Sequence, residues 1–337
     1  MSNYAYVATR ARSRRSRLLP AEAYNQLLNL EHAEIARYIQ DLEYRREIDR
    51  YGSTLSGADL IETALVDNLA KDIGDFLSFS KGKLRDILHV YAEKYRVDNL
   101  KNIIRGINQN MDRQNLERLV CPINDSDKDL YSKLYDSKTV EDVISSLEGT
   151  SYYNPLKKAL ESRNSDSLQP LEDTLDLIYY RNLVSNQPSG GADVEVYRNF
   201  VQLKVDIANI KTLLRMRHRG IGSHDELLIN GGTLVTDLLA STQSLEDLLS
   251  SLEGTKYFEL LEPHLKPDSV DLNSCVHSLD EYMAKKTKRF SYLYPLSVLP
   301  VLDYLLKKER EVYNLRAIVR GKQAGLANDI IEELVVV

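Results

Sequence analysis

Six basic side chains fall at matching places in three copies of one short sequence phrase. The phrase reads Asn-aliphatic-Lys/Arg-x-aliphatic-aliphatic-Arg and begins at residues 99, 209 and 314. Guanidinium and ammonium groups pair with carboxylates and with the carbonyl groups at helix C-termini. We expect the asparagines to form local hydrogen bonds, and the cations either to contact acidic or carbonyl-rich loops of a partner or to cap the protein's own helices. These cations are Lys101, Arg105, Lys211, Arg215, Arg316 and Arg320.

A row of carboxylates is a second candidate for chemistry. Asp125, Asp127, Asp129 and Asp136 occupy positions 1, 3, 5 and 12 of a twelve-residue window, as in a calcium-binding loop. However, position 6 is Leu130, where the tight turn of such a loop needs Gly, and position 12 is not the usual bidentate Glu. The window therefore argues against calcium, and we expect neither a metal nor a cofactor.

The common catalytic signatures are absent from the sequence. It contains no G-x-x-x-x-G-K-[ST], no H-E-x-x-H and no G-x-S-x-G. Its two cysteines, Cys121 and Cys275, are far apart and lack metal or redox spacing, which favours a reducing compartment. We therefore do not expect this chain alone to hydrolyse nucleotides, and the resemblance described below implies a non-catalytic protein.

The basic phrases belong to a chain that repeats itself about every hundred residues. Residues 139–153 align with residues 244–258, and each copy predicts a short helix capped by Thr139 or Ser244 with an acid three residues on. Ahead of each basic phrase lies a stretch with helical periodicity. These stretches are residues 58–97, 171–206 and 279–312.

The repeats predict the fold class and its division. We expect an all-α protein of three similar helical lobes, residues 1–110, 111–221 and 222–337, because strand signals are weak throughout. Three similar units favour a pseudo-threefold, funnel-shaped arrangement. One departure is Met216, where the other two phrases are followed by Gly106 and Gly321.

Charge is distributed unevenly along the chain. The net charge is −6, yet residues 1–17 carry five arginines and no acid. This N-terminal run is either an arm for nucleic acid or anionic lipid, or a packed helix with solvated arginines. The longest nearly apolar run, residues 292–302, contains two prolines and is shorter than the ~20 residues that a membrane-spanning helix needs. We therefore expect no membrane span.

Residues 4–19, the three basic phrases and the closing segment 320–326 together resemble the C subunit of archaeal-type (A-type) ATP synthases. The eukaryotic counterpart is the d subunit of the V-type ATPase, and the resemblance extends over essentially the whole chain. It implies an all-helical, funnel-shaped adaptor of the central stalk. Such an adaptor transmits torque between ATP synthesis or hydrolysis and the transport of hydrogen or other ions.

The resemblance also implies partners and a location. The partners would be the coiled-coil D subunit of the stalk with its associate F, the proteolipid rotor ring and, through the stalk, the catalytic A and B subunits. The protein would be peripheral on the cytoplasmic face of the cell membrane, attached there through its protein partners. It would bind no nucleic acid. The alternative is a helical scaffold or regulator that binds nucleic acid or anionic lipid through Arg12, Arg14 and Arg15.

Overall fold

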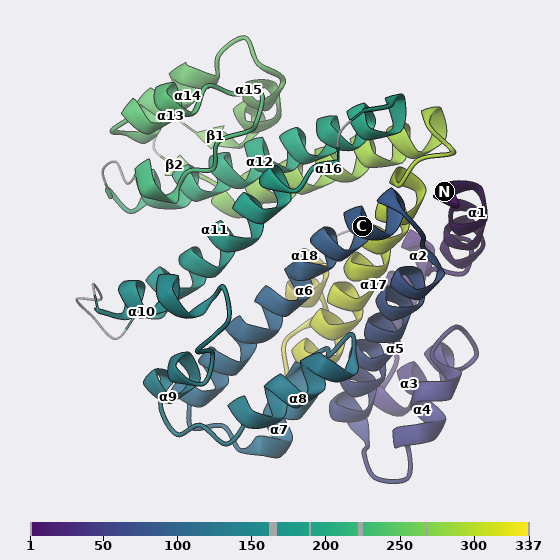
Figure 1. Ribbon diagram of the computed structural model, residues 1–337. Coiled ribbons are helices and arrows are strands. Elements are labelled where there is room, and N and C mark those ends of the chain that lie inside the picture. The colour runs from purple at the N-terminus through teal and green to yellow at the C-terminus, as the bar shows by residue number, and fades with distance from the viewer. Residues whose placement is uncertain (1, 162–166, 189, 222–224, 267–268, 336–337) are drawn as a thin grey trace. The chain divides into compact units, whose positions relative to one another are not determined.

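The structure is a computed structural model that describes residues 2–161, 167–188, 190–221, 225–266 and 269–335 (Figure 1). Helices make up most of these residues, so the all-α prediction is confirmed. Within the described ranges the strands are β1 (Leu265–Lys266) and β2 (Ser269–Val270), which form one short antiparallel pair.

The chain forms two compact units. The first comprises Met1–Glu172 and Tyr304–Val337, and the second comprises Asp173–Asp303. The division into three lobes stays a prediction. Helices of the first unit are α1 (Tyr4–Arg15), α2 (Ala21–Leu27), α3 (His32–Gln40), α4 (Arg45–Tyr51), α5 (Gly57–Phe79), α6 (Lys83–Asn108), α7 (Arg113–Leu119), α8 (Asp125–Leu134), α9 (Val140–Ser145), α10 (Tyr153–Glu161), α17 (Leu299–Gln323, from Tyr304 onward) and α18 (Asn328–Leu334).

The second unit is also helical. Besides the strand pair it contains α11 (Gln169–Ser185, from Asp173 onward), α12 (Ala192–His218), η1 (Asp225–Leu227), α13 (Thr236–Ser241), α14 (Leu245–Leu252), α15 (Lys256–Leu261), η2 (Glu262–His264) and α16 (Leu272–Leu293).

The three stretches of helical periodicity correspond to the long helices. Residues 58–97 fall on α5 and α6, residues 171–206 on α11 and α12, and residues 279–312 on α16 and α17. In α5, for example, Ile61, Leu65 and Ile73 are almost fully buried and Leu69 nearly so, as an apolar side chain at every fourth position predicts.

The duplicated segment forms the same capped helix twice. In α9 the Thr139 hydroxyl accepts a hydrogen bond of 3.1 Å from the Asp142 N–H, and the Asp142 carboxylate accepts one of 3.0 Å from the Thr139 N–H. Ser244 and Asp247 repeat both bonds at 3.0 Å in α14. The predicted capping boxes are therefore confirmed, and the backbone hydrogen bonds lower the pKa of both aspartates.

A buried polar cluster fixes α17 inside the first unit. The Lys308 ammonium is 1% exposed, donates 2.7 Å to the Tyr44 hydroxyl and lies 3.3 Å from the Glu311 carboxylate. That carboxylate also accepts 2.5 Å from the Tyr44 hydroxyl and 2.6 Å from the Leu19 N–H. Since each buried charge has a partner of opposite sign and further hydrogen bonds, the cluster ties the N-terminal segment to α17.

Candidate functional site

The three helices that carry the basic phrases end in the same turn. Five residues after the closing Arg, the backbone adopts a left-handed conformation, and the next N–H bonds back to the carbonyl five residues earlier, as in a Schellman motif. The left-handed residues are Asn110 (φ 55°), Gly220 (φ 68°) and Gly325 (φ 72°). The bonds run from Met111 to Gly106 (2.9 Å), from Ile221 to Met216 (3.0 Å) and from Leu326 to Gly321 (3.0 Å).

The turn is followed by a short packed helix in two of the three copies. The Cα of Gly106 lies against Leu116 of α7, and that of Gly321 lies against Ile331 of α18. A Cβ on Gly106 would lie 2.3 Å from the Leu116 side chain, and a Cβ on Gly321 would lie 2.6 Å from the Ile331 side chain. The position equivalent to Leu116 and Ile331 in the middle copy is the exposed Glu226. This difference explains why Met216 is accommodated there.

The asparagines that open the phrases hold neighbouring segments. The Asn99 amide donates 2.8 Å to the Cys121 carbonyl, and its oxygen accepts 2.8 Å from the Cys121 N–H. Asn209 makes the same two bonds to Ile229, at 2.8 and 2.9 Å. Asn314 is fully buried and hydrogen-bonds the Tyr24 side chain. The expectation of local hydrogen bonds is thus confirmed for Asn99 and Asn209. It is wrong for Asn314, whose partner Tyr24 belongs to the N-terminal segment.

In the first copy, Arg105 forms a two-pronged ion pair. Its Nε and Nη2 atoms each donate 2.6 Å to one oxygen of Glu172, which lies in the first turn of α11. The guanidinium is half exposed, whereas the Glu172 side chain is largely buried. Lys101 lies half-buried one helical turn before Arg105.

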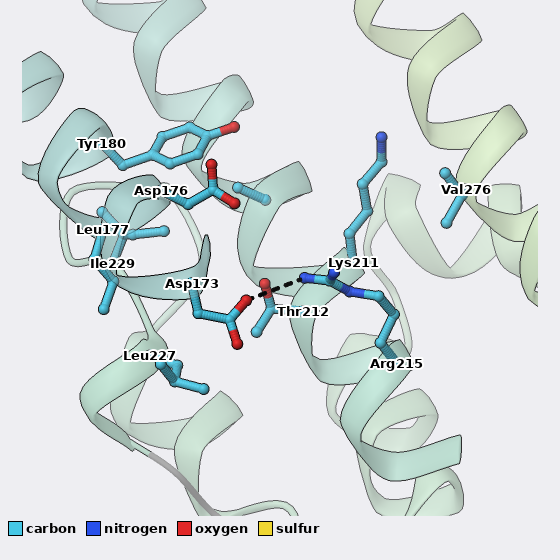
Figure 2. Close-up of a pocket in the computed structure, with 11 residues that line it drawn as sticks. Asp173, Asp176, Leu177, Tyr180, Lys211, Thr212, Arg215, Leu227, Ile229 and Val276 are labelled. Atoms are coloured by element: carbon cyan, nitrogen blue, oxygen red, sulfur yellow. Dashed lines mark ion pairs between the residues drawn. The ribbon is translucent and has the colours of Figure 1, made fainter. Parts of the chain in front are cut away.

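In the second copy, the cations line a cavity of about 290 Å³ inside the second unit. Figure 2 shows Lys211 and Arg215 of α12 across from Asp173, Asp176 and Tyr180 of α11. Arg215 is only loosely paired, 4.0 Å from the Asp173 carboxylate, and is about half exposed. The Lys211 ammonium lies 2.5 Å from Asp280 of α16. This cavity therefore presents two cations, two carboxylates and a phenol.

In the third copy, the equivalent helix face lines a hollow of about 490 Å³ in the first unit. Arg316 lies 3.3 Å from Glu62 of α5, and Arg320 pairs with both Glu62 and Asp59, the latter at 3.3 Å. The hydrogen bond with Glu62 raises the pKa of Arg320. The side chain of Tyr313 lies at the exposed edge.

The two hollows use repeat-equivalent positions. The α12 residues Ala208, Lys211, Thr212 and Arg215 correspond, 105 residues on, to the α17 residues Tyr313, Arg316, Ala317 and Arg320. The acids on the opposing helices follow the same period, since Glu62, Glu172 and Asp280 are 110 and 108 residues apart. Sequence reasoning missed these acids, although the repeat period could have found them.

The carboxylates of the described residues are not arranged to hold a metal ion. Within the described residues, no group of three or more His, Cys, Asp or Glu side chains is placed to hold a metal ion. The calcium-like window begins the helix α8 and does not form a loop. Asp125 pairs with Lys128 at 2.9 Å, and Asp127 pairs with Arg96 at 2.7 Å.

Three of the five N-terminal arginines make contacts within the first unit. Arg14 lies 2.7 Å from Asp72 and 2.5 Å from Asp75, and Arg17 lies 2.9 Å from Glu43. Arg10 stacks on the Phe79 ring, 4.3 Å from its centroid. Side chains held in this way favour a packed helix over a nucleic-acid arm.

The fold is that of an all-helical repeat protein, and each of its two units contains a hollow lined by repeat-equivalent charged residues. Residues 7–334 match the profile of the ATP synthase (C/AC39) subunit family. The match spans nearly the whole chain, and the protein belongs to this family.

Curated relatives agree with this assignment. The chain is 36% identical to the A-type ATP synthase C subunit of Haloferax volcanii, over 99% of this chain and 98% of the relative. It is 33% identical to that of Archaeoglobus fulgidus, over 99% and 96%, and 31% identical to that of Methanosarcina mazei, over 100% and 93%. The family resemblance is confirmed, and membership identifies a non-catalytic subunit. In the described part of the chain, no helix has the length and apolarity needed to cross a membrane.

Proposed function

We propose that this protein is the non-catalytic central-stalk adaptor of a rotary A/V-type ATPase. The observation that carries the proposal is its similarity, over nearly the full length of both chains, to the C subunits of A-type ATP synthases. In this role it connects the stalk shaft to the membrane proteolipid ring. It transmits torque between ATP synthesis or hydrolysis and ion transport, including hydrogen ion transport.

The partners follow from this role. The coiled-coil D subunit of the stalk with its associate F binds on the shaft side, and the proteolipid ring binds on the membrane side. The catalytic A and B subunits are reached through the stalk. The protein works as a peripheral membrane protein on the cytoplasmic face, in a three-lobed, funnel-shaped form.

Torque transmission requires a stiff body, and the helix ends supply stiffness. Each long helix of a basic phrase stops in a hydrogen-bonded left-handed turn. Each phrase also makes an ion pair with an acid at a repeat-equivalent position of another long helix. Since local backbone bonds and interlocked apolar stripes resist bending, helical hairpins joined in this way deform little under load.

The cations then serve two purposes. Arg105, Arg316 and Arg320, paired with largely buried acids, brace the protein's own helices. Arg215, with a 4.0 Å ion pair and an open cavity beside it, contacts acidic or carbonyl-rich loops of a partner protein. Lys101 lies one helical turn before Arg105, and Lys211 lies one helical turn before Arg215, so each lysine adds positive charge beside its arginine.

Co-purification tests the proposal. The tagged chain is used as bait in detergent-solubilised membranes, and the captured proteins are identified by mass spectrometry. We expect the A and B subunits, a coiled-coil stalk protein and a proteolipid, and we expect the folded protein to retain them after Arg12, Arg14 and Arg15 are replaced by Ala. Capture of nucleic acid without ATPase subunits, lost in that triple variant, would refute the adaptor role.

A further inference from the structure

The turn between α16 and α17 displays apolar side chains to solvent. Tyr292 is 57% exposed, Leu293 59%, Tyr294 41% and Leu296 64%. These residues, with the intervening Pro295, are called the α16 tip below, and all belong to the second unit. Contiguous exposed apolar side chains of this size are uncommon on a monomer surface and mark an interaction site.

The α16 tip is held in one conformation by hydrogen bonds. The Tyr294 N–H donates 2.9 Å to the Phe290 carbonyl, and the Ser297 hydroxyl donates 2.7 Å to the Tyr294 carbonyl. The buried Val298 and Leu299 follow immediately. The apolar side chains therefore point outward from a fixed turn.

A basic stripe leads to the α16 tip. The sequence contains no acid between Glu281 and Asp303, but four cations. Lys285, Lys288, Arg289 and Tyr292 are exposed at positions i, i+3, i+4 and i+7, so they share one face of α16. The four cations are Lys285, Lys286, Lys288 and Arg289.

The opposite face of α16 is buried, which fixes the orientation of the stripe. Leu279, Met283, Thr287 and Ser291 are buried at every fourth position. Of the cations, Lys285 pairs with Glu281 at 2.6 Å and Lys286 lies 5.3 Å from the centre of the Tyr282 ring. In the described part of the chain, Lys288 and Arg289 have no acidic partner within ion-pair distance, so their charge faces outward.

We propose that the α16 tip is an interfacial anchor that binds an anionic phospholipid bilayer. Tyr and Leu side chains at a bilayer surface settle at the boundary between headgroups and acyl chains, and Lys or Arg beside them attract anionic headgroups. The α16 tip and its acid-free stripe combine both features on one element. The proposal goes beyond the adaptor role and revises the expectation that protein partners alone hold the chain at a membrane.

A tryptophan reporter tests the contact directly. The chain has no Trp but 21 Tyr, so Leu296→Trp, excited at a wavelength that tyrosine does not absorb, gives tryptophan emission from the α16 tip alone. We expect a blue shift and a higher intensity with vesicles of phosphatidylcholine and phosphatidylglycerol, and a much smaller change with phosphatidylcholine alone. An emission spectrum unchanged by both kinds of vesicle would overturn the proposal.

Co-sedimentation of the unlabelled chain with the same vesicles gives the specificity. Each exposed cation near an anionic surface strengthens binding roughly fivefold, so Lys288→Gln with Arg289→Gln should weaken partitioning about 25-fold. Tyr292→Ser with Leu293→Ser should also lower it. Val235→Ser with Leu238→Ser, which changes two other exposed apolar residues of the second unit, is the matched control and should bind as the wild type does.

Two outcomes would overturn the lipid contact. One is equal loss of binding in the control. The other is a wild-type chain that stays in the supernatant while the Tyr292→Ser, Leu293→Ser variant loses ATPase subunits in co-purification, because the α16 tip would then contact protein. The two proposals can fail separately. Variants that lose vesicle binding should still co-purify with the ATPase subunits, whereas failure of the adaptor role would appear as a wild-type chain that captures no ATPase subunits.

Discussion

The Asn99 side chain is hydrogen-bonded to both backbone polar groups of Cys121, at 2.8 Å each. Asn209 repeats this relationship with Ile229 in the second unit. In both copies a buried asparagine side chain of a long helix hydrogen-bonds the N–H and carbonyl groups of a buried residue some twenty positions further along the chain. The asparagines therefore fasten the segments that follow the basic phrases.

Asn99→Ala should destabilise the protein markedly. It leaves the buried N–H and carbonyl of Cys121 without their side-chain partner, and each unsatisfied buried group costs about 1–3 kcal/mol. We expect the free energy of unfolding to fall by roughly 2–4 kcal/mol in urea titrations followed by circular dichroism. Asn108→Ala, at an exposed position of the same helix, should change it by less than about 0.5 kcal/mol. Equal effects of the two variants would contradict the account.

Lys308→Met should lower the stability of the protein more than the similar shapes of the Lys and Met side chains suggest. The Glu311 carboxylate would stay buried without its cation, which typically costs about 3–5 kcal/mol. Thermal unfolding should show a clearly lower midpoint, and the double variant Lys308→Met, Glu311→Leu should recover part of the loss. Lys133→Met, at an exposed position of α8, is the control. A Lys308→Met protein with unchanged stability would show that the cluster does not fix α17.

The capping aspartates should produce a dependence of stability on acid pH. Hydrogen bonds from the Ser244 and Gln243 N–H groups lower the folded-state pKa of Asp247 below its ordinary value of 3.8. A lowered folded pKa means that the stabilisation is fully present above the unfolded pKa and is lost as the pH falls through the folded pKa. Asp247→Ala should therefore lower stability at neutral pH, and the difference from the wild type should vanish in strong acid.

Glu246→Ala is the control for that experiment, because Glu246 is exposed in the same helical turn without forming the capping box. Urea titrations between neutral and strongly acid pH measure the difference. A gap between Asp247→Ala and the wild type that stays constant through this range would contradict the capping explanation.

Arg215→Ala should weaken partner binding without unfolding the chain. Arg215 is about half exposed and its ion pair with Asp173 is long, so its removal should cost less than about 1 kcal/mol of stability. Loss of a charge contact to a partner should lower affinity for the isolated stalk proteins or the proteolipid ring about tenfold, measured by biolayer interferometry. Arg219→Ala, exposed just beyond the end of α12, is the matched control. Unchanged affinity for both partners would assign Arg215 to its own helices only.

Sequence periodicity predicted the helices well because their determinants are local. The apolar positions of α5, the capping boxes at Thr139 and Ser244 and the ends of the basic phrases all depend on residues within a few turns. The repeat also predicted that the six cations occupy equivalent positions. It could not predict the loosely paired state of Arg215 or the difference between Asn314 and the other two asparagines.

The remaining features depend on contacts between distant parts of the sequence. Glu62 meets Arg320 across 258 residues, and Tyr44 meets Lys308 across 264. The composition of residues 292–302 argues against a membrane span. It does not show that residues 292–296 are exposed whereas Val298 and Leu299 are buried, which is evident only from the structure. Burial, charge pairing and exposure of that kind are set by tertiary packing, which the periodicity of one sequence does not encode.

The most direct test of the adaptor role is to measure whether the chain couples ATP hydrolysis to the rotor ring. The complex is purified with and without this protein, and the ring is blocked with a reagent that modifies its ion-binding carboxyl groups. With the chain present, blocking the ring should stop ATP hydrolysis; without it, hydrolysis should continue and no ion should be pumped. Hydrolysis that stays equally sensitive to the ring block when the chain is missing would contradict the adaptor role.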